Sequence, residues 1–171
     1  MKKGRIWIVW AFLLMYLFCL LYITLLSRSG SSSRIFRADV FASWRMWFGG
    51  NAVKGRSILQ NVALFVPLGF FLTQALSLPK RRGRFLIAVG IGFAVSLLIE
   101  TVQYYTGRGW FDVEDLFNNT LGAAVGSGLF FAVERMAGKG KAGRVACDVL
   151  SVILIAAGVV GCLQMKKMIG R

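Results

Sequence analysis

The feature that most constrains the fold is a series of apolar runs long enough to cross a lipid bilayer. The first, at residues 6–26, contains no charged residue. An α-helix rises about 1.5 Å per residue, so about 20 apolar residues cross roughly 30 Å of hydrocarbon. Further runs of this kind occupy residues 58–78, 85–105, 113–133 and 145–165. The sequence therefore predicts an all-α, polytopic transmembrane helix bundle with about five spans, in a single domain over residues 1–171.

Composition supports a membrane protein and argues against a nucleic-acid-binding one. Hydrophobic residues make up 57% of the chain and charged residues 16%, which is too apolar for an ordinary soluble domain. The formal net charge is +14, but the bases punctuate apolar runs and form no soluble basic face. We therefore expect membrane lipid, and no nucleic acid, as the partner of these bases. The sequence has no histidine, which removes the commonest general base and metal ligand.

The predicted orientation follows from the Lys and Arg residues in the short connecting segments. Three bases precede the first span, four follow the second and four follow the fourth, whereas the loop after the third span holds only Arg108. Because short loops rich in Lys and Arg stay in the cytoplasm, this pattern predicts a cytoplasmic N-terminus. The six bases of the first loop and the three at the C-terminus argue the other way. The first apolar run is too long for a signal peptide and lacks a clear cleavage site, so we expect a retained span.

The long first loop, residues 27–57, contains a stretch with helical periodicity. In a helix over this stretch, one face would carry aromatic and aliphatic side chains and another would carry arginines. The apolar face would consist of Phe36, Val40, Trp44 and Trp47, and the basic face of Arg34 and Arg45. This arrangement is typical of a helix that lies in the membrane interface, with aromatic residues at the headgroup boundary. The sequence therefore predicts an interfacial amphipathic helix in this outer loop.

Polar residues gather in the stretch from Glu100 to Gly126, which holds four of the seven acidic residues of the chain. Ionisable groups next to hydrocarbon are costly, so they mark candidate functional sites. In the predicted topology this stretch converges with Asn61 at the outer end of the bundle. The candidate ligand-binding residues are Asn61, Glu100, Gln103, Arg108, Asp112, Asp115 and Asn119.

Helical spacing places several of these residues on one face of the fourth span. Asp112, Asp115 and Asn119 are separated by three and then four residues, so they form a stripe that continues through Gly122 and Gly126. The two glycines form a small-xxx-small pair, which allows another helix to approach closely. The stripe therefore predicts a polar cluster with a packing seam beneath it.

The electrostatics of the cluster leave several chemistries open. Three neighbouring acids would repel one another if all were ionised, so we expect Arg108 to neutralise one of them. Glu100 or Asp115 with a raised pKa could act as general acid or base on a lipid-linked substrate. Carboxylate and amide oxygens could hold a divalent cation, and no other cofactor is predicted. Arg108 and the acids could instead bind a polar ligand without chemistry, or the cluster could be a structural network that fixes helix register.

Two segments of the chain carry the motifs of a known family. The first, NVALFVPLGFFL, contains Asn-x3-Phe-x-Pro-x-Gly. The second contains Glu-x2-Gln, then Gly-Arg, then Asp-x2-Asp-x3-Asn-Thr-x-Gly-x3-Gly. In this order and spacing the chain resembles the VanZ-like family, bacterial membrane proteins named for a member associated with teicoplanin resistance. The motif positions are Asn61, Phe65, Pro67, Gly69, Glu100, Gln103, Gly107, Arg108, Asp112, Asp115, Asn119, Thr120, Gly122 and Gly126.

The resemblance implies a multi-pass protein of the bacterial cytoplasmic (plasma) membrane, with a family core at about residues 57–133. A proline inside a helix frees a backbone carbonyl, so the second span should also be kinked. Two ambiguities remain in the motif: spacing selects Asn119 over the adjacent Asn118, and Glu114 is an extra acid that points away from the stripe. The expected packing residues are Pro67, Gly69, Gly122 and Gly126.

Our leading interpretation is an outward-facing polar pocket that binds a cell-envelope component or an amphiphilic, lipoglycopeptide-type antibiotic and contributes to antibiotic tolerance. The alternative is a membrane enzyme that acts on a lipid or lipid-linked envelope substrate, with Glu100 or Asp115 as acid and base. Against the enzyme, no nucleophile with an activating base is recognisable. A transporter fits less well, because five spans without a visible inverted repeat leave little room for alternating access.

Overall fold

The structure is a computed structural model that describes residues 3–26, 35–76, 78–138, 140, 142–143, 145–154 and 156–157. The long elements are all helices. Two strands of two residues each pair with one another in a short parallel ladder. Four helices, α1, α3, α4 and α5, are long and apolar enough to cross a membrane, and a shorter apolar helix covers Val145–Leu154. The prediction of an all-helical, multi-pass membrane protein is therefore confirmed. Residues 158–165 of the predicted fifth span lie outside the described residues.

The helix boundaries follow capping groups as well as hydrophobicity. α1 spans Lys3–Leu21 and continues as a π-helical segment, η1, over Tyr22–Leu26. α3 begins earlier than the predicted residue 58, because the side chain of Asn51 caps its first turn by accepting a hydrogen bond from Lys54 N at 3.2 Å. The bounds of the remaining long helices are Ala52–Ala75 for α3, Arg81–Thr106 for α4 and Val113–Met136 for α5.

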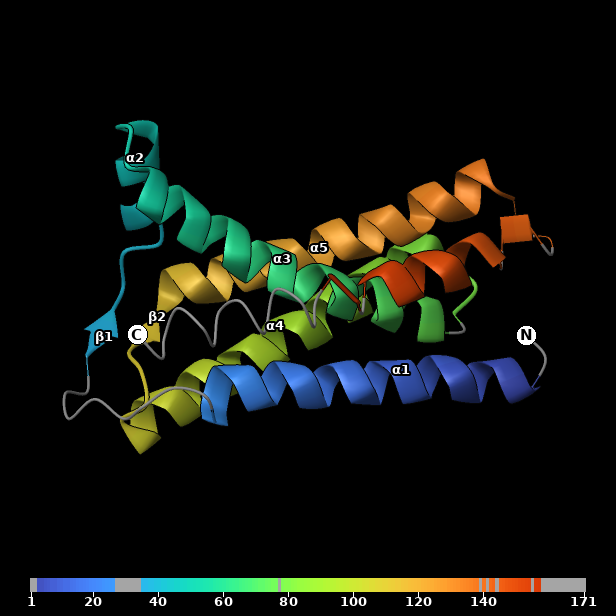
Figure 1. Cartoon of the computed structure of the whole chain (residues 1–171), viewed down its shortest axis with the longest axis horizontal. Helices are drawn as coiled ribbons and strands as arrows, with labels where there is room; N and C mark the ends of the chain where they lie inside the picture. Colours follow the sequence, from blue (N-terminus) through green and yellow to red (C-terminus); the bar gives the residue numbers. More distant parts are fainter. Residues whose placement is uncertain are drawn as a thin grey trace.

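α3 and α5 lie side by side at the centre of the bundle (Figure 1). Their contact depends on residues without a side chain. An added Cβ at Gly69, Gly122 or Gly126 would lie only 2.0, 2.2 or 1.9 Å from a backbone oxygen of the facing helix. Pro67, the other predicted packing residue, is buried inside α3. The two backbones can therefore approach more closely than any larger residue at these glycines would permit.

The two ends of the bundle differ in composition. At one end, which we call the polar end, the start of α5 meets the strands β1 (Phe36–Arg37) and β2 (Phe111–Asp112) and the short helix α2 (Ala42–Phe48), as Figure 1 shows. The opposite end, which we call the basic end, contains the start of α1, the start of α4 and the end of α5. Lys80, Arg81, Arg82, Arg84 and Glu134 lie there.

The first loop forms a helix, but the predicted face of that helix is wrong. Phe36 lies in β1, where it pairs with Phe111 of β2 in a parallel ladder, and Val40 lies in a turn before α2. Local periodicity could not reveal this pairing, because the two strands are far apart in the sequence. Within α2, Trp47 packs over Gly55 of α3, while Phe48 is 80% exposed. Within α2 the exposed aromatic residue is therefore not one of those predicted to face the membrane boundary, although Phe36 in β1 is 61% exposed.

Candidate functional site

The polar end contains a cleft of about 310 Å³ between α2, the start of α3 and the start of α5. Its walls combine acids, bases and hydroxyl groups from four separate segments of the chain. They include Arg37, Ser43, Lys54, Ser57, Asp112, Glu114 and Asp115. Two of the seven predicted site residues, Asp112 and Asp115, thus line the cleft directly, together with bases that the sequence analysis did not single out.

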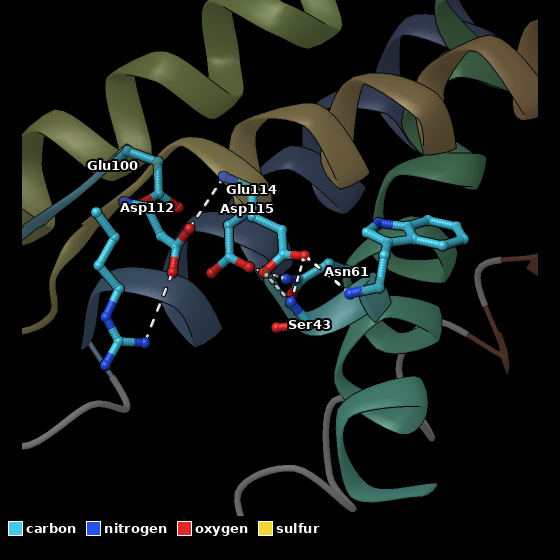
Figure 2. A network of polar contacts seen from close by, with 8 residues as sticks. Ser43, Asn61, Glu100, Asp112, Glu114 and Asp115 are labelled. Carbon is cyan, nitrogen blue, oxygen red and sulfur yellow. Dashed lines mark hydrogen bonds and ion pairs between the residues drawn. The ribbon is translucent and has the colours of Figure 1, made fainter. Parts of the chain in front are cut away.

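Asp115 is held in place from the neighbouring helix. Asn61 of α3 donates a hydrogen bond from Nδ2 to Asp115 Oδ1 of α5 (Figure 2). The sequence analysis placed both residues in one cluster on the basis of the predicted topology, and the structure brings them together. Asp115 is therefore positioned in the cleft wall by a fixed neutral donor.

Asp112 is the N-cap of α5 and also contacts α4 and β1. Its backbone N–H donates to Glu100 Oε2 at 3.0 Å, and its Oδ1 accepts from Glu114 N at 2.9 Å. Its Oδ2 lies 3.9 Å from Arg37 Nη1, on the paired strand β1. Burial raises the pKa of Asp112 above its ordinary value, which its hydrogen bond from Glu114 N and the charge of Arg37 partly oppose.

Glu114 has a structural role that the sequence analysis missed. It is only 4% exposed, and its carboxylate accepts hydrogen bonds from Ser43 N at 2.9 and 3.1 Å and from Trp44 N at 3.3 Å. These are N–H groups in the first turn of α2, which has no cap from its own N-terminal residue. Figure 2 shows the Glu114 side chain pointing toward Ser43. Glu114 therefore caps a helix about 70 residues away in the sequence.

A second contact fixes α2 against α5. Trp44 Nε1 donates to Asn118 Oδ1 at 3.0 Å, and Asn118 is 1% exposed. The adjacent Asn119 points instead toward α4, where its Nδ2 donates to Ser96 Oγ at 2.9 Å. Both asparagines are thus buried with different partners, and Asn119, which spacing selected for the site, lies between helices and not in the cleft wall.

Gln103 and Arg108 connect α4 to the end of α1. Gln103 Nε2 donates to Thr24 O at 2.9 Å, and Arg108 Nη1 donates to Leu25 O at 3.0 Å. Carbonyl groups at a helix end lack intrahelical partners, which explains why these donors are drawn to η1. We expected Arg108 to neutralise an acid, but it forms no ion pair among the residues that the structure describes, and Arg37 is the base placed beside Asp112.

The charged groups of the cleft do not form an obvious metal site. Within the described ranges, no three Asp, Glu or Cys side chains are grouped as metal ligands. Lys54 lines the cleft and makes no ion pair with any residue that the structure describes. The cleft thus presents an ammonium group and the Arg37 guanidinium beside carboxylates that are already engaged with the protein.

A second pocket lies across the short β ladder from the cleft. It has a volume of about 300 Å³ and is lined by Phe36, Thr101, Tyr104, Tyr105 and Phe111. Neighbouring residues of a strand point to opposite faces, so the Phe36–Phe111 pair and the Arg37–Asp112 pair serve different sides of one ladder. The two phenyl rings are stacked, with centroids 5.2 Å apart. An aromatic pocket and a polar cleft therefore share one dividing wall.

Comparison with known proteins identifies the family of the chain. A family model described as VanZ/LLP1 matches residues 12–134, a range that contains the cleft and all four long helices in whole or in part. No curated protein and no solved structure matches the chain. The family match also covers the first loop, which lies outside the motifs that carried the resemblance.

Proposed function

Because the chain belongs to the VanZ/LLP1 family of membrane proteins, we propose that its polar cleft binds an anionic, amphiphilic component of the cell envelope or a lipoglycopeptide-type antibiotic. The observation that carries this proposal is the placement of Lys54, which makes no ion pair with the described residues, near Arg37 in a cleft whose acids accept hydrogen bonds from protein groups. A ligand carboxylate or phosphate would pair with these bases, because charge-assisted hydrogen bonds to such groups are the strong ones.

The size and surroundings of the cleft favour a ligand with both polar and apolar parts. A volume of about 310 Å³ is at the small end of ligand sites, so the cleft would hold a headgroup or one polar substituent of a larger molecule. The aromatic pocket across the ladder would take an apolar or ring-shaped part of the same molecule. This arrangement supports an amphiphile over a small ion.

The location that goes with this function is the outer face of the bacterial plasma membrane, with the N-terminus in the cytoplasm. The distribution of Lys and Arg supports this orientation, since the connection between α3 and α4 and the first turn of α4, at the basic end, carry Lys80, Arg81, Arg82 and Arg84. The test is Thr106→Cys in a variant whose native cysteines are replaced by serine. Thr106 is exposed at the end of α4, so a membrane-impermeant maleimide should label intact cells. Labelling that requires permeabilised cells would place the cleft inside and contradict the proposal.

The binding role is tested by expressing the chain in a teicoplanin-sensitive bacterium. We expect wild type to raise the inhibitory concentration of teicoplanin and to change the amount of fluorescent teicoplanin bound to the cells. Lys54→Gln and Asp115→Asn should abolish both effects while the protein remains in the membrane. Arg135→Gln is the matched control, because Arg135 is exposed and lies at the basic end. Wild-type behaviour of both cleft variants would contradict a role for the cleft.

The enzymatic alternative now rests on Asp115. Glu100 is 3% exposed and accepts the backbone N–H of Asp112, whereas Asp115 lines the cleft itself. Purified protein carrying Asp115→Asn would separate the two functions. Retained teicoplanin binding with lost turnover of a lipid-linked envelope substrate would favour an enzyme, and loss of binding would favour the binding role. No feature of the described residues favours a transporter.

A further inference from the structure

The basic end carries a shallow groove that the proposed function does not use. It has a volume of about 340 Å³ and lies between the start of α4 and the end of α5. Its walls come from Arg81, Arg82, Phe85, Leu86 and Phe131. Arginine side chains thus border a groove whose remaining walls are aromatic and aliphatic.

The charges around this groove are unbalanced. Arg81 Nη2 and Arg84 Nη2 share one acceptor, Glu134 Oε2, at 3.1 and 3.5 Å. Arg82 has no acidic partner among the residues that the structure describes. With Lys80, these four bases and one acid leave an excess of three positive charges. The groove therefore has a cationic rim that the acids of the described residues do not neutralise.

The arginines beside the groove are also held in position by aromatic rings. The guanidinium carbon of Arg81 lies 5.7 Å from the centroid of Phe131, and that of Arg84 lies 5.1 Å from the same ring. Such cation–π contacts orient the side chains. In addition, Arg84 Nε is buried and has no hydrogen-bond partner within the described part of the chain. Arg81 and Arg84 are thus oriented beside the groove by these rings and by Glu134, whereas Arg82 is exposed at its edge.

The arginines and the apolar walls of the groove lie at the levels of the membrane where a phospholipid has its headgroup and its acyl chains, respectively. α4 is a candidate membrane span that begins at Arg81, so its first turn lies at headgroup level. Phe85 and Leu86 come one turn later, about 6 Å deeper at 1.5 Å per residue, and Leu86 is 67% exposed. A phosphate beside Arg82 would therefore place an acyl chain along the apolar walls.

We propose that this groove is a binding site for an anionic phospholipid. The phosphate pairs with Arg82, and one acyl chain packs against Phe85, Leu86 and Phe131. The excess positive charge selects an anionic lipid, because a zwitterionic headgroup brings its own cation to the rim. The apolar walls select a lipid over a free phosphate ion, which could not use them.

The test measures binding of phosphatidylglycerol to the purified full-length protein in detergent by native mass spectrometry. Phosphatidylcholine with the same acyl chains and glycerol 3-phosphate are the comparison ligands. We expect phosphatidylglycerol to bind preferentially and Arg82→Gln to weaken that binding about fivefold, as estimated for one base at an anionic surface. Arg135→Gln removes the same charge from an exposed position at the same end and should leave the binding unchanged.

Several outcomes would overturn the proposal. Equal binding of phosphatidylcholine would remove the role of the cationic rim. Displacement of phosphatidylglycerol by equimolar glycerol 3-phosphate would indicate a simple phosphate site. An equal effect of Arg82→Gln and Arg135→Gln would indicate diffuse attraction to the basic end. The lipid-free unfolding temperatures of both variants should equal that of wild type, which ensures that the comparison concerns lipid binding.

Discussion

At the polar end, Glu100 and Glu114 accept hydrogen bonds from backbone N–H groups, whereas at the basic end Glu134 accepts from two arginine side chains. A backbone donor cannot turn away when its acceptor is lost, but an arginine near the membrane surface can turn toward headgroups. The acids of the polar end therefore hold separate segments together. The acid of the basic end balances charge locally, and it is outnumbered by the bases around it.

This difference also explains why the polar end has a cleft. Glu114 fixes α2 above the start of α5, and Asp112 joins α5 to β1 through the ladder and to α4 through Glu100. The carboxylates are engaged in these connections. The basic groups of the cleft wall are Arg37, which lies 3.9 Å from Asp112, and Lys54, which makes no ion pair with the described residues. At the basic end no described segment covers Arg81 and Arg82 in this way, and the groove beside them is open.

The largest expected effect comes from the packing seam between α3 and α5, the close contact at Gly69, Gly122 and Gly126 that runs between the polar end and the basic end. Gly126→Ala places a methyl group 1.9 Å from Val66 O, and a backbone oxygen of the facing helix can move only if α3 and α5 separate. We expect a loss of roughly 3 kcal/mol in the free energy of unfolding. Thermal unfolding in detergent, followed by circular dichroism, measures it. Gly128→Ala is the control, because an added Cβ there meets no atom within 4 Å; equal effects of the two changes would contradict the seam.

The next effect compares the loss of stability when Glu114, an acid of the polar end, or Glu134, the acid of the basic end, is replaced by alanine. Glu114→Ala leaves the partly buried N–H groups of Ser43 and Trp44 without their acceptor and should cost about 2 kcal/mol. Glu134→Ala frees arginines of which Arg81 is already half-exposed, so it should cost less than about 1 kcal/mol. Unfolding temperatures give both values, and hydrogen exchange at Ser43 and Trp44 should rise only in the first variant. A larger loss in Glu134→Ala would reverse our interpretation of the two ends.

A smaller effect isolates the attachment of α2 to α5. Trp44→Phe removes the indole N–H that donates to Asn118, leaving a buried acceptor unpaired, and should cost about 1 kcal/mol. Trp47→Phe is the matched change, since the ring of Trp47 covers Gly55 and its N–H makes no hydrogen bond to the described residues. Protease cleavage within residues 38–50 should become faster in Trp44→Phe than in Trp47→Phe. The same rate in both variants would mean that the hydrogen bond does not hold α2 down.

The smallest effect is a pH dependence at Asp112. Burial raises its pKa in the folded protein above 3.8, so the folded state retains this proton at a higher pH than the unfolded chain does. Ionised Asp112 therefore costs stability, and this cost disappears as the pH falls through the raised pKa toward 3.8. Asp112→Asn keeps an N-cap acceptor without the titration. The unfolding temperature of wild type relative to the variant should rise as the pH falls, and a difference that stays constant with pH would refute the assignment.

Local patterns in the sequence predicted the features that depend on local chemistry. Membrane-length hydrophobic runs predicted the long helices, since crossing the bilayer requires a minimum apolar length. The three-and-four spacing through Asp115, Gly122 and Gly126 placed these residues on one side of α5, which faces α3 in the structure. These inferences need only the helical period and a rough topology.

Non-local pairing was beyond the same reasoning. Glu114 was set aside because it lies off the stripe, yet its partners belong to a loop 70 and 71 residues earlier. The carbonyl that receives Arg108 is 83 residues away, on a helix end whose π-helical geometry the sequence did not reveal. Two features of the sequence could have linked Glu114 to α2. The N-terminal residue of α2 supplies no side-chain cap, and Glu114 is an acid in the first turn of α5 that lies off the polar stripe.

The separation between Glu114 and α2 has a consequence for synthesis of the protein. α2 leaves the ribosome before α3, α4 and the start of α5, so its capping carboxylate does not yet exist when it emerges. At about 5–20 residues per second, roughly 4–14 seconds pass before Glu114 is made. During this interval the first turn of α2 lacks the Glu114 carboxylate that accepts its N–H groups in the complete fold. The cleft therefore forms only after α5 has been inserted, and a chain truncated before residue 114 would have the early helices but no cleft.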